Sequence, residues 1–209
     1  MQNIYERDEW SKIKVMHPGG LDLTNSLIKL SGLENGRIMD IGCGCGTTVA
    51  YLRETGFDAV GVDLSDSLIA RGLELYPDIP LYAADAESLP FSDEEFDASL
   101  MACSLSLMDI ERALKECRRL VRRNGFLLIS DLYCNDDSDG SSGKTLVGWR
   151  DAIEKQGFTL THIENCSCVL SDFIAQILWD NGSLGVVAGC DKWMKSTIPG
   201  YFIASARKN

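Results

Sequence analysis

Residues 38–46 carry the residue types best suited to ligand chemistry, an acid followed by three alternating glycines. The segment reads Ile-Met-Asp-Ile-Gly-Cys-Gly-Cys-Gly, with Asp40 two residues before Gly42. An apolar run that breaks into glycines predicts a buried parallel strand, a tight turn and a helix from Thr47. Because glycine has no side chain, a ligand can approach this backbone closely, and we expect the amides of the turn and of the helix start to face it. The pattern predicts a nucleotide-like small molecule at the carboxyl end of the strand, which is typical of an enzyme.

The spacing of the glycines separates two classes of cofactor. A dinucleotide fold usually shows G-x-G-x-x-G, whose third glycine would fall at position 47. Position 47 is threonine, and the third glycine is Gly46, after Gly44. This G-x-G-x-G turn behind Asp40 resembles the S-adenosylmethionine (SAM) loop of class I methyltransferases. On its own the motif leaves a nicotinamide or flavin site open.

An acid also ends the next predicted strand. Asp63 closes the segment 57–63 and lies roughly 20 residues after the first glycine, where a carboxylate can accept both ribose hydroxyls. This feature fits either class of cofactor. A purely structural alternative is that Asp63 is a helix N-terminal acid, because acids are favoured there.

Two later segments strengthen the resemblance to methyltransferases. Residues 81–91 predict a strand ending in Asp85, and the run Asp-Ala-Glu-Ser-Leu-Pro-Phe resembles the segment that holds adenine in that family. The resemblance implies that Asp85 takes the adenine amino group and that the amide of Ala86 contacts the ring. Residues 96–102 predict another strand, whose end would lie beside the methionine part of SAM.

The resemblance covers about residues 38–131 and, more weakly, the rest up to the C-terminus. It implies SAM as the cofactor, held at one edge of a sheet. The implied cofactor contacts are Asp40, Gly42, Cys43, Gly44, Gly46, Asp63, Leu64, Asp85, Ala86 and Ala102. Two of these acids have structural alternatives. Asp40 could tie the turn together, because carboxylates accept backbone amides well, and Asp85 could be a solvated loop acid.

Length and composition predict one soluble globular domain. A chain of 209 residues can build a full core, and 45% apolar with 24% charged residues is ordinary for such a domain. No apolar run approaches the roughly 20 residues that span a bilayer. The first ten residues lack the layout of a signal peptide. We therefore expect a cytoplasmic protein, a single domain over 1–209, with residues 1–36 as an N-terminal cap.

The net charge of −11 bears on the choice of partner. Nucleic-acid binders usually carry a basic surface, so a nucleic-acid substrate is disfavoured. Sequence detail agrees, because the Asp/Asn-Pro-Pro-aromatic motif of amino-directed DNA methyltransferases is missing, and so is the Pro-Cys pair of cytosine-C5 enzymes. We expect a small neutral, cationic or metalloid substrate and no membrane partner, and leave a basic protein partner open.

Predicted strands and helices alternate along the chain. Helices are predicted at 21–32, 47–55, 66–75, 109–123, 146–156 and 170–180, and strands at 37–41, 57–62, 80–84, 96–102, 126–132, 158–169 and 200–207. The helix at 109–123 has the clearest apolar face, with Asp109 as its N-cap and its C-terminal arginines on a solvated face. Residues 135–143 are too polar to pack and predict a mobile loop. The order resembles the α/β, Rossmann-like methyltransferase sheet of seven strands, mostly parallel with an antiparallel last strand and helices on both faces.

The eight cysteines are not spaced like a zinc site, because C-x-C occurs at 43/45 and 166/168 and C-x-x-C never does. Cys117 lies on the apolar face of its helix and is expected in the core, and Cys43 and Cys45 are expected to fill a crowded turn. The pair at 166/168 would point to one side of a strand.

Cys103 and Cys134 fall just beyond two predicted strands, where the methyl group should lie. Residues 96–103 and 129–133 resemble matching segments of arsenite methyltransferases, and Cys103 falls on one of that family's metalloid-binding cysteines. The later cysteine of that family would fall near residues 141–142, which are serines, and its N-terminal cysteine has no counterpart. Two sulfurs bind a soft centre less well than three, so a related soft nucleophile or a small thiol is slightly favoured over arsenite as the acceptor.

Methyl transfer from a sulfonium is an in-line displacement, in which the enzyme aligns nucleophile and methyl about 3–3.5 Å apart. A base is needed only if the nucleophile carries a proton. His17 opens a His-Pro-Gly-Gly turn that could reach the cofactor, or could be structural. The catalytic residues therefore stay unassigned, with His17 and Cys103 as candidates. An NAD(P)-dependent oxidoreductase of similar fold and a non-catalytic SAM-binding accessory protein remain the alternatives.

Overall fold

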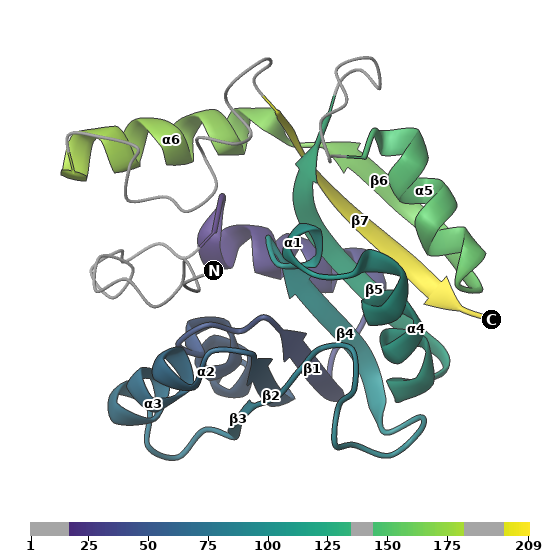
Figure 1. Cartoon of the computed structure of the whole chain (residues 1–209), viewed down its shortest axis with the longest axis horizontal. Helices are drawn as coiled ribbons and strands as arrows, with labels where there is room; N and C mark the ends of the chain where they lie inside the picture. The colour runs from purple at the N-terminus through teal and green to yellow at the C-terminus, as the bar shows by residue number, and fades with distance from the viewer. Residues whose placement is uncertain (1–16, 135–143, 182–198) are drawn as a thin grey trace.

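The computed structural model describes residues 17–134, 144–181 and 199–209, which form a sheet covered by helices on both faces (Figure 1). The strands are β1 (Arg37–Ile41), β2 (Asp58–Asp63), β3 (Leu81–Ala83), β4 (Phe96–Ala102), β5 (Val121–Tyr133), β6 (Phe158–Asn165) and β7 (Gly200–Lys208). The helices are α1 (Gly20–Ser31), α2 (Thr47–Glu54), α3 (Asp66–Leu75), the 3₁₀ turn η3 (Leu105–Leu107), α4 (Ile110–Leu120), α5 (Leu146–Lys155) and α6 (Ser167–Asn181).

Within the described residues the sheet has seven strands in the order β3-β2-β1-β4-β5-β7-β6. β1 pairs in parallel with β2 and β4, and β5 continues this direction beside β4. β7 runs antiparallel between β5 and β6. The predicted sheet, mostly parallel with an antiparallel last strand, is confirmed.

The strand order reverses at β1, because β2 follows on one side and β4 on the other. In open α/β sheets, ligands bind in the crevice outside the carboxyl ends of the strands at such a point. The glycine turn follows β1 directly, so the fold brings the predicted ligand segment to this crevice.

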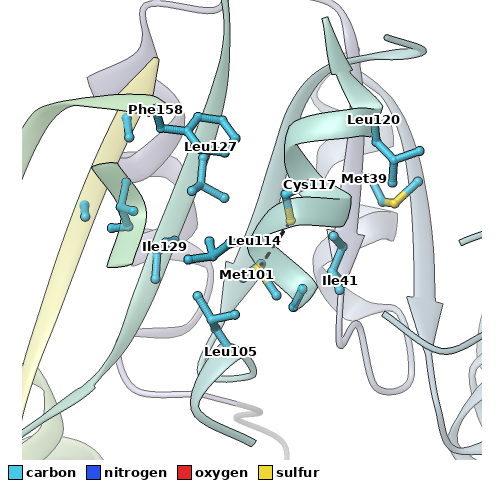
Figure 2. Packing of buried hydrophobic residues seen from close by; sticks show 14 of the residues in the cluster. Met39, Ile41, Met101, Leu105, Leu114, Cys117, Leu120, Leu127, Ile129 and Phe158 are labelled. Carbon is cyan, nitrogen blue, oxygen red and sulfur yellow. Dashed lines mark hydrogen bonds between the residues drawn. The ribbon is translucent and has the colours of Figure 1, made fainter. Parts of the chain in front are cut away.

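Two apolar layers cover the two faces of the sheet. Figure 2 shows one of them, in which α4 packs on β1, β4 and β5. Cys117 of α4 lies in this layer as expected, and its Sγ lies 3.7 Å from Sδ of Met101. The opposite layer includes Leu27 of α1, Val49 of α2, Ile69 of α3 and Leu170 of α6. Neighbouring residues of β1 pack into opposite layers, as strand alternation requires.

Several element bounds differ from the prediction by one or two residues, and larger differences occur at two junctions, α4 with β5 and β6 with α6. The helix predicted at 109–123 ends at Leu120, because Val121 already pairs with Phe96 in the sheet. The strand predicted at 158–169 ends at Asn165, and α6 begins at Ser167. The Asn165 side-chain oxygen accepts hydrogen bonds from the Ser167 amide (2.9 Å) and hydroxyl (2.6 Å), which favours a helix start. The cysteines at 166 and 168 therefore do not share a strand face.

The predicted loop 135–143 and the first 16 residues of the predicted cap lie outside the described residues. In the part of the chain that the structure describes, no helix combines the length and apolar character needed to cross a membrane.

Candidate active site at the carboxyl ends of the strands

The glycine turn after β1 needs its glycines for two reasons. Gly42, Gly44 and Gly46 have φ values of 78°, 54° and 77°, in the left-handed region that other residues rarely adopt. A Cβ on Gly42 would also overlap the Cβ of Ser104. Gly46 then precedes the first residue of α2. The sequence therefore forms a tight turn with bare backbone at the strand end.

The amides of this turn bond within the protein. The amides of Gly42 and Cys43 donate to the carbonyl of Val62 (2.8 and 3.0 Å), and the amide of Gly46 donates to the carbonyl of Cys43 (2.9 Å). The amide of Gly44 donates to Oδ2 of Asp63 at 2.8 Å. The expectation that the turn amides face a ligand is wrong for these four. Three of them hold the turn against β2, and the Gly46 amide closes the turn itself.

The Asp63 carboxylate joins the turn to the next strand end. Oδ2 accepts from the Gly44 amide, and Oδ1 accepts from the Ser65 amide at 2.9 Å. A carboxylate has about four acceptor positions, so two amides leave room for ribose hydroxyls. The N-cap of α3 is Ser65, whose hydroxyl accepts from the Leu68 amide. Asp63 therefore lies before the helix and is not its N-terminal acid.

Asp40 is a buried acid beside this junction. The residue is 3% exposed, and none of the hydrogen bonds among the described residues involves its carboxylate. The alternative that Asp40 ties the turn together by accepting amides is therefore not supported. Burial, and then the negative charge of Asp63, raise the pKa of Asp40 to about 7. A cation next to these two acids would relieve both effects and favour the ionised form.

The two cysteines of the turn are buried, as expected for small residues that fill a crowded site. A Cβ on Gly61 of β2 would lie 2.8 Å from Sγ of Cys43, so the thiol packs against the sheet. Burial raises the pKa of the Cys43 thiol well above its ordinary value. Cys43 can therefore contribute backbone, but not a thiolate, to a ligand site.

The predicted adenine contacts lie at the ends of β2 and β3, which are neighbours in the sheet (Figure 1). Leu64 follows Asp63 with 68% of its surface exposed, and Ala86 is half-buried against the core. Asp85 is exposed, and its Oδ1 accepts from the Glu87 amide at 2.9 Å. An exposed apolar side chain and an accessible carboxylate offer a flat ring both surface and an acceptor.

Arg119 of α4 holds the segment that follows Asp85. Its guanidinium donates to the carbonyls of Leu89 (3.0 Å) and Phe91 (2.7 Å) and pairs with Glu116 and Asp93. Arg119 therefore braces this segment from within the protein, and the expectation that it belongs to a solvated face is wrong for this arginine. A depression of about 570 Å³ beside it lies near the start of β4, at the edge opposite the glycine turn, and is not part of the candidate site.

The turn after β4 is anchored on both neighbouring strands. Ala102 ends the strand, and Cys103 adopts a φ of 57° while its amide donates to the carbonyl of Ser130 at 2.7 Å. The hydroxyl of Ser104 donates to the carbonyl of Ile41 at 2.7 Å. The half-buried Cys103 is thereby fixed between the ends of β1 and β5.

Asp131 is a site residue to which the sequence analysis gave no role. It is fully buried, and its carboxylate accepts from the amide (2.9 Å) and hydroxyl (2.7 Å) of Ser106 and from the Leu132 amide (2.7 Å). Burial raises its pKa to about 6 despite these bonds. Asp131 could have been recognised from the sequence, because it is an acid within an apolar strand segment, as Asp40 is.

The other two candidates lie at the same edge of the sheet. The Cys134 amide donates to the Lys144 carbonyl at 2.9 Å just beyond β5, and His17 is a buried residue before α1. No group of three or more His, Cys, Asp or Glu side chains among the described residues could hold a metal ion. The serines expected near the third arsenite-family cysteine lie outside these residues.

Comparison with known proteins gives matches to methyltransferases. Residues 39–129 match the sequence model described as a methyltransferase domain. The uncharacterized methyltransferase YodH of Bacillus subtilis is 32% identical over 154 residues, which cover 71% of this chain and 64% of that protein. The demethylmenaquinone methyltransferase of Beutenbergia cavernae is 36% identical over 98 residues, 46% of this chain and 40% of that enzyme. The chain thus spans less than two thirds of the length of these curated relatives.

A solved structure agrees on the fold. The crystal structure of the [4+2]-cyclase SpnF matches with a TM-score of 0.74 at 22% identity, over 97% of this chain and 84% of that chain. At so low a sequence identity, the match supports a shared fold but not a shared reaction. The domain match over residues 39–129, the strand order and the glycine turn at the point of reversal make this chain similar to the class I SAM-dependent methyltransferases and disfavour the oxidoreductase alternative.

Proposed function

We propose that this chain transfers the methyl group of SAM to a small-molecule acceptor at the carboxyl ends of β1, β4 and β5. The observation that carries the proposal is the 2.8 Å bond from the Gly44 amide to Asp63. This bond joins the bare glycine backbone to a half-buried carboxylate with spare acceptor capacity, which suits a nucleoside with a charged tail.

The residues fit SAM in charge. SAM supplies a methyl group on a positively charged sulfur when it is bound. Asp40 and Asp63 give the crevice negative charge, and the Asp40 carboxylate has no partner among the described residues. In the proposed arrangement Asp63 accepts the ribose hydroxyls, and Asp85 with Ala86 and Leu64 contacts the adenine. Gly42, Cys43, Gly44, Gly46 and Ala102 offer backbone to the methionine part.

The acceptor class is the open part of the proposal. The related Beutenbergia enzyme is described as a demethylmenaquinone methyltransferase, which supports testing hydroquinones first. A thiol or trivalent arsenic is the alternative class of methyl acceptor, supported by Cys103 at the end of β4. We further propose that residues 1–209 act as one domain with residues 1–36 as its cap, without nucleic-acid or membrane partners.

Calorimetry of the reduced protein with SAM, S-adenosylhomocysteine (SAH) and NADH tests the cofactor. We expect binding of SAM and SAH and none of NADH. Replacing Asp63 by alanine should weaken SAM binding by about 1.5–3 kcal/mol, because hydrogen bonds to a charged group are lost. Asp58→Ala is the matched control, since this exposed acid lies at the other end of the same strand. Equal SAM affinities in the two variants would refute the ribose assignment.

SAH release with a set of acceptors tests the transfer. Hydroquinones, small thiols and arsenite are each supplied with SAM, and Cys103→Ser is compared with the unchanged protein. Loss of activity on thiols or arsenite alone would support a soft acceptor at Cys103. SAM binding without turnover of any acceptor class would favour the accessory-protein alternative.

A further inference from the structure

The ring of the buried His17 makes one hydrogen bond within the part of the chain that the structure describes. Its side chain is 6% exposed, and Nδ1 lies 3.1 Å from the carbonyl oxygen of Pro18. A carbonyl oxygen only accepts, so Nδ1 carries the proton in this bond. The lone pair of the neutral ring is then on Nε2. No hydrogen bond among the described residues involves Nε2.

The backbone holds His17 just before the N-terminus of α1. The Gly20 amide donates to the His17 carbonyl at 3.1 Å, so the chain turns before the helix begins. Gly19 has a φ of 76°, and a Cβ there would lie 2.8 Å from Val169 in the first turn of α6. The turn that carries His17 therefore packs on α6 and admits little movement.

The first turn of α6 connects this histidine to the methyl-transfer edge. The hydroxyl of Ser167 accepts from the amide of Tyr201, and the Tyr201 hydroxyl donates to Ser130 at 3.1 Å. Ser130 also accepts the amide of Cys103 at the end of β4. A continuous set of contacts thus runs from the His17 turn to the carboxyl ends of β4 and β5.

We propose that Nε2 of His17 is the general base for the methyl acceptor, an inference that rests on the proposed function. The acceptor atom forms its bond to the methyl carbon as the carbon–sulfur bond breaks, and both electrons of that bond go to sulfur. The acceptor's proton passes to Nε2 and leaves an imidazolium, which later releases it to water. The products are the methylated acceptor and SAH.

The assignment selects an acceptor class. A base is needed only by a nucleophile that carries a proton, such as a phenol, hydroquinone or thiol. Burial lowers the pKa of His17 below its ordinary 6.5, and no ionised side chain of the described residues contributes to this shift. The ring is therefore neutral, and able to accept a proton, at physiological pH.

Nuclear magnetic resonance of the histidine rings tests the assignment without a known acceptor. The chain has two histidines, and His162 on β6 serves as the internal control. SAM and SAH differ by the positive charge at sulfur, so a base beside the methyl group should titrate differently in the two complexes. We expect the Nδ1–H tautomer, and a His17 pKa lower with SAM than with SAH by about one unit or more. The ring signals of His162 should not differ between the two complexes.

Three results would overturn the proposal or its basis. An Nε2–H tautomer leaves no lone pair toward the acceptor, and equal His17 pKa values in the two complexes place the ring away from the methyl group. Either result overturns the base assignment while SAM binding stands. Absence of SAM binding in calorimetry would overturn the proposed function itself.

The His17→Asn variant adds a kinetic test, because asparagine keeps a short amide donor but no base. Transfer to a proton-bearing acceptor should slow by about 10²–10⁴-fold, with the Kd for SAM unchanged. A second reaction serves for comparison, in which SAH takes the methyl group of iodomethane to give SAM and iodide. It requires no proton removal, so its rate should be the same in His17→Asn and in the unchanged protein. Equal loss of both reactions would show a structural role and overturn the proposal. His162→Gln should change neither.

Discussion

Replacing Asp40 by asparagine should change how the free energy of unfolding depends on pH. The Asp40 pKa is about 7 in the folded protein, raised first by burial and then by Asp63, against an ordinary value of 3.8. The folded state therefore binds this proton more tightly than the unfolded chain does. The resulting stabilisation is fully present below about pH 4 and is lost as the pH rises through 7.

The size of the effect follows from the pKa difference. A shift of about 3 units corresponds to about 4 kcal/mol, and about 3 kcal/mol of this falls between pH 5 and pH 8. Asparagine stays neutral throughout. The unfolding free energy of the Asp40→Asn variant, minus that of the unchanged protein, should therefore rise by about 3 kcal/mol between pH 5 and pH 8.

Urea unfolding followed by tryptophan fluorescence at several pH values measures this difference. Asp131, whose pKa is also raised, is present in both proteins, so its titration cancels. Asp58→Asn is the control, because this exposed acid is paired only at the surface. The reasoning would be refuted if the unfolding free energies of Asp40→Asn and the unchanged protein differed by the same amount at pH 5 and at pH 8.

Three further outcomes are expected. In thermal unfolding, Gly42→Ala should be less stable than Gly32→Ala by about 1–3 kcal/mol of unfolding free energy. Both glycines have positive φ, but only a Cβ at position 42 would meet a neighbouring side chain. Ser106→Ala should lose about 1.5–3 kcal/mol in urea unfolding, through its bond to a buried carboxylate, whereas Ser26→Ala, exposed on α1, should change little. In calorimetry, SAM should bind more tightly at pH 8 than at pH 6, since its positive sulfur favours ionised Asp40, and SAH should show a much weaker trend. A similar trend for both ligands would contradict this last expectation.

The elements around the site were predictable because local signals mark them. An apolar run before glycines gave β1 at 37–41, and the segment 96–102 was predicted with the bounds that β4 has. The helix at 66–75 likewise matches α3, which begins after a serine N-cap. These segments carry their own start and stop signals, so no knowledge of distant contacts was needed.

The errors arose where a contact distant in sequence decided the outcome. The apolar pattern of α4 continues to Val121, but pairing with Phe96 takes that residue into the sheet. The turn amides were expected to face a ligand, yet the carbonyl of Val62 accepts two of them. Periodicity within one segment contains no information about which strand will lie beside it.

The residues of the candidate site also differ in whether the sequence alone could predict them. Asp63 could be named from its spacing to the first glycine, and Asp40 and Asp85 from the resemblance of their segments to those of methyltransferases. The anchoring of the acceptor side could not, because Asp131 meets Ser106 only after β4 and β5 are aligned. Such positioning contacts depend on register, which a single sequence does not reveal.

The Arg119 brace has a consequence for the entropy of cofactor binding. Its bonds to the Leu89 and Phe91 carbonyls, with that of the Leu89 amide to Glu116 (2.8 Å), hold the segment after Asp85 in the protein without ligand. The conformational freedom of this segment is therefore lost during folding, and binding does not have to remove it again. In the proposed arrangement an adenine ring would meet a segment that is already ordered. Ligand affinity and global stability would then be coupled through one guanidinium, 30 residues downstream of the Leu89 carbonyl that it holds.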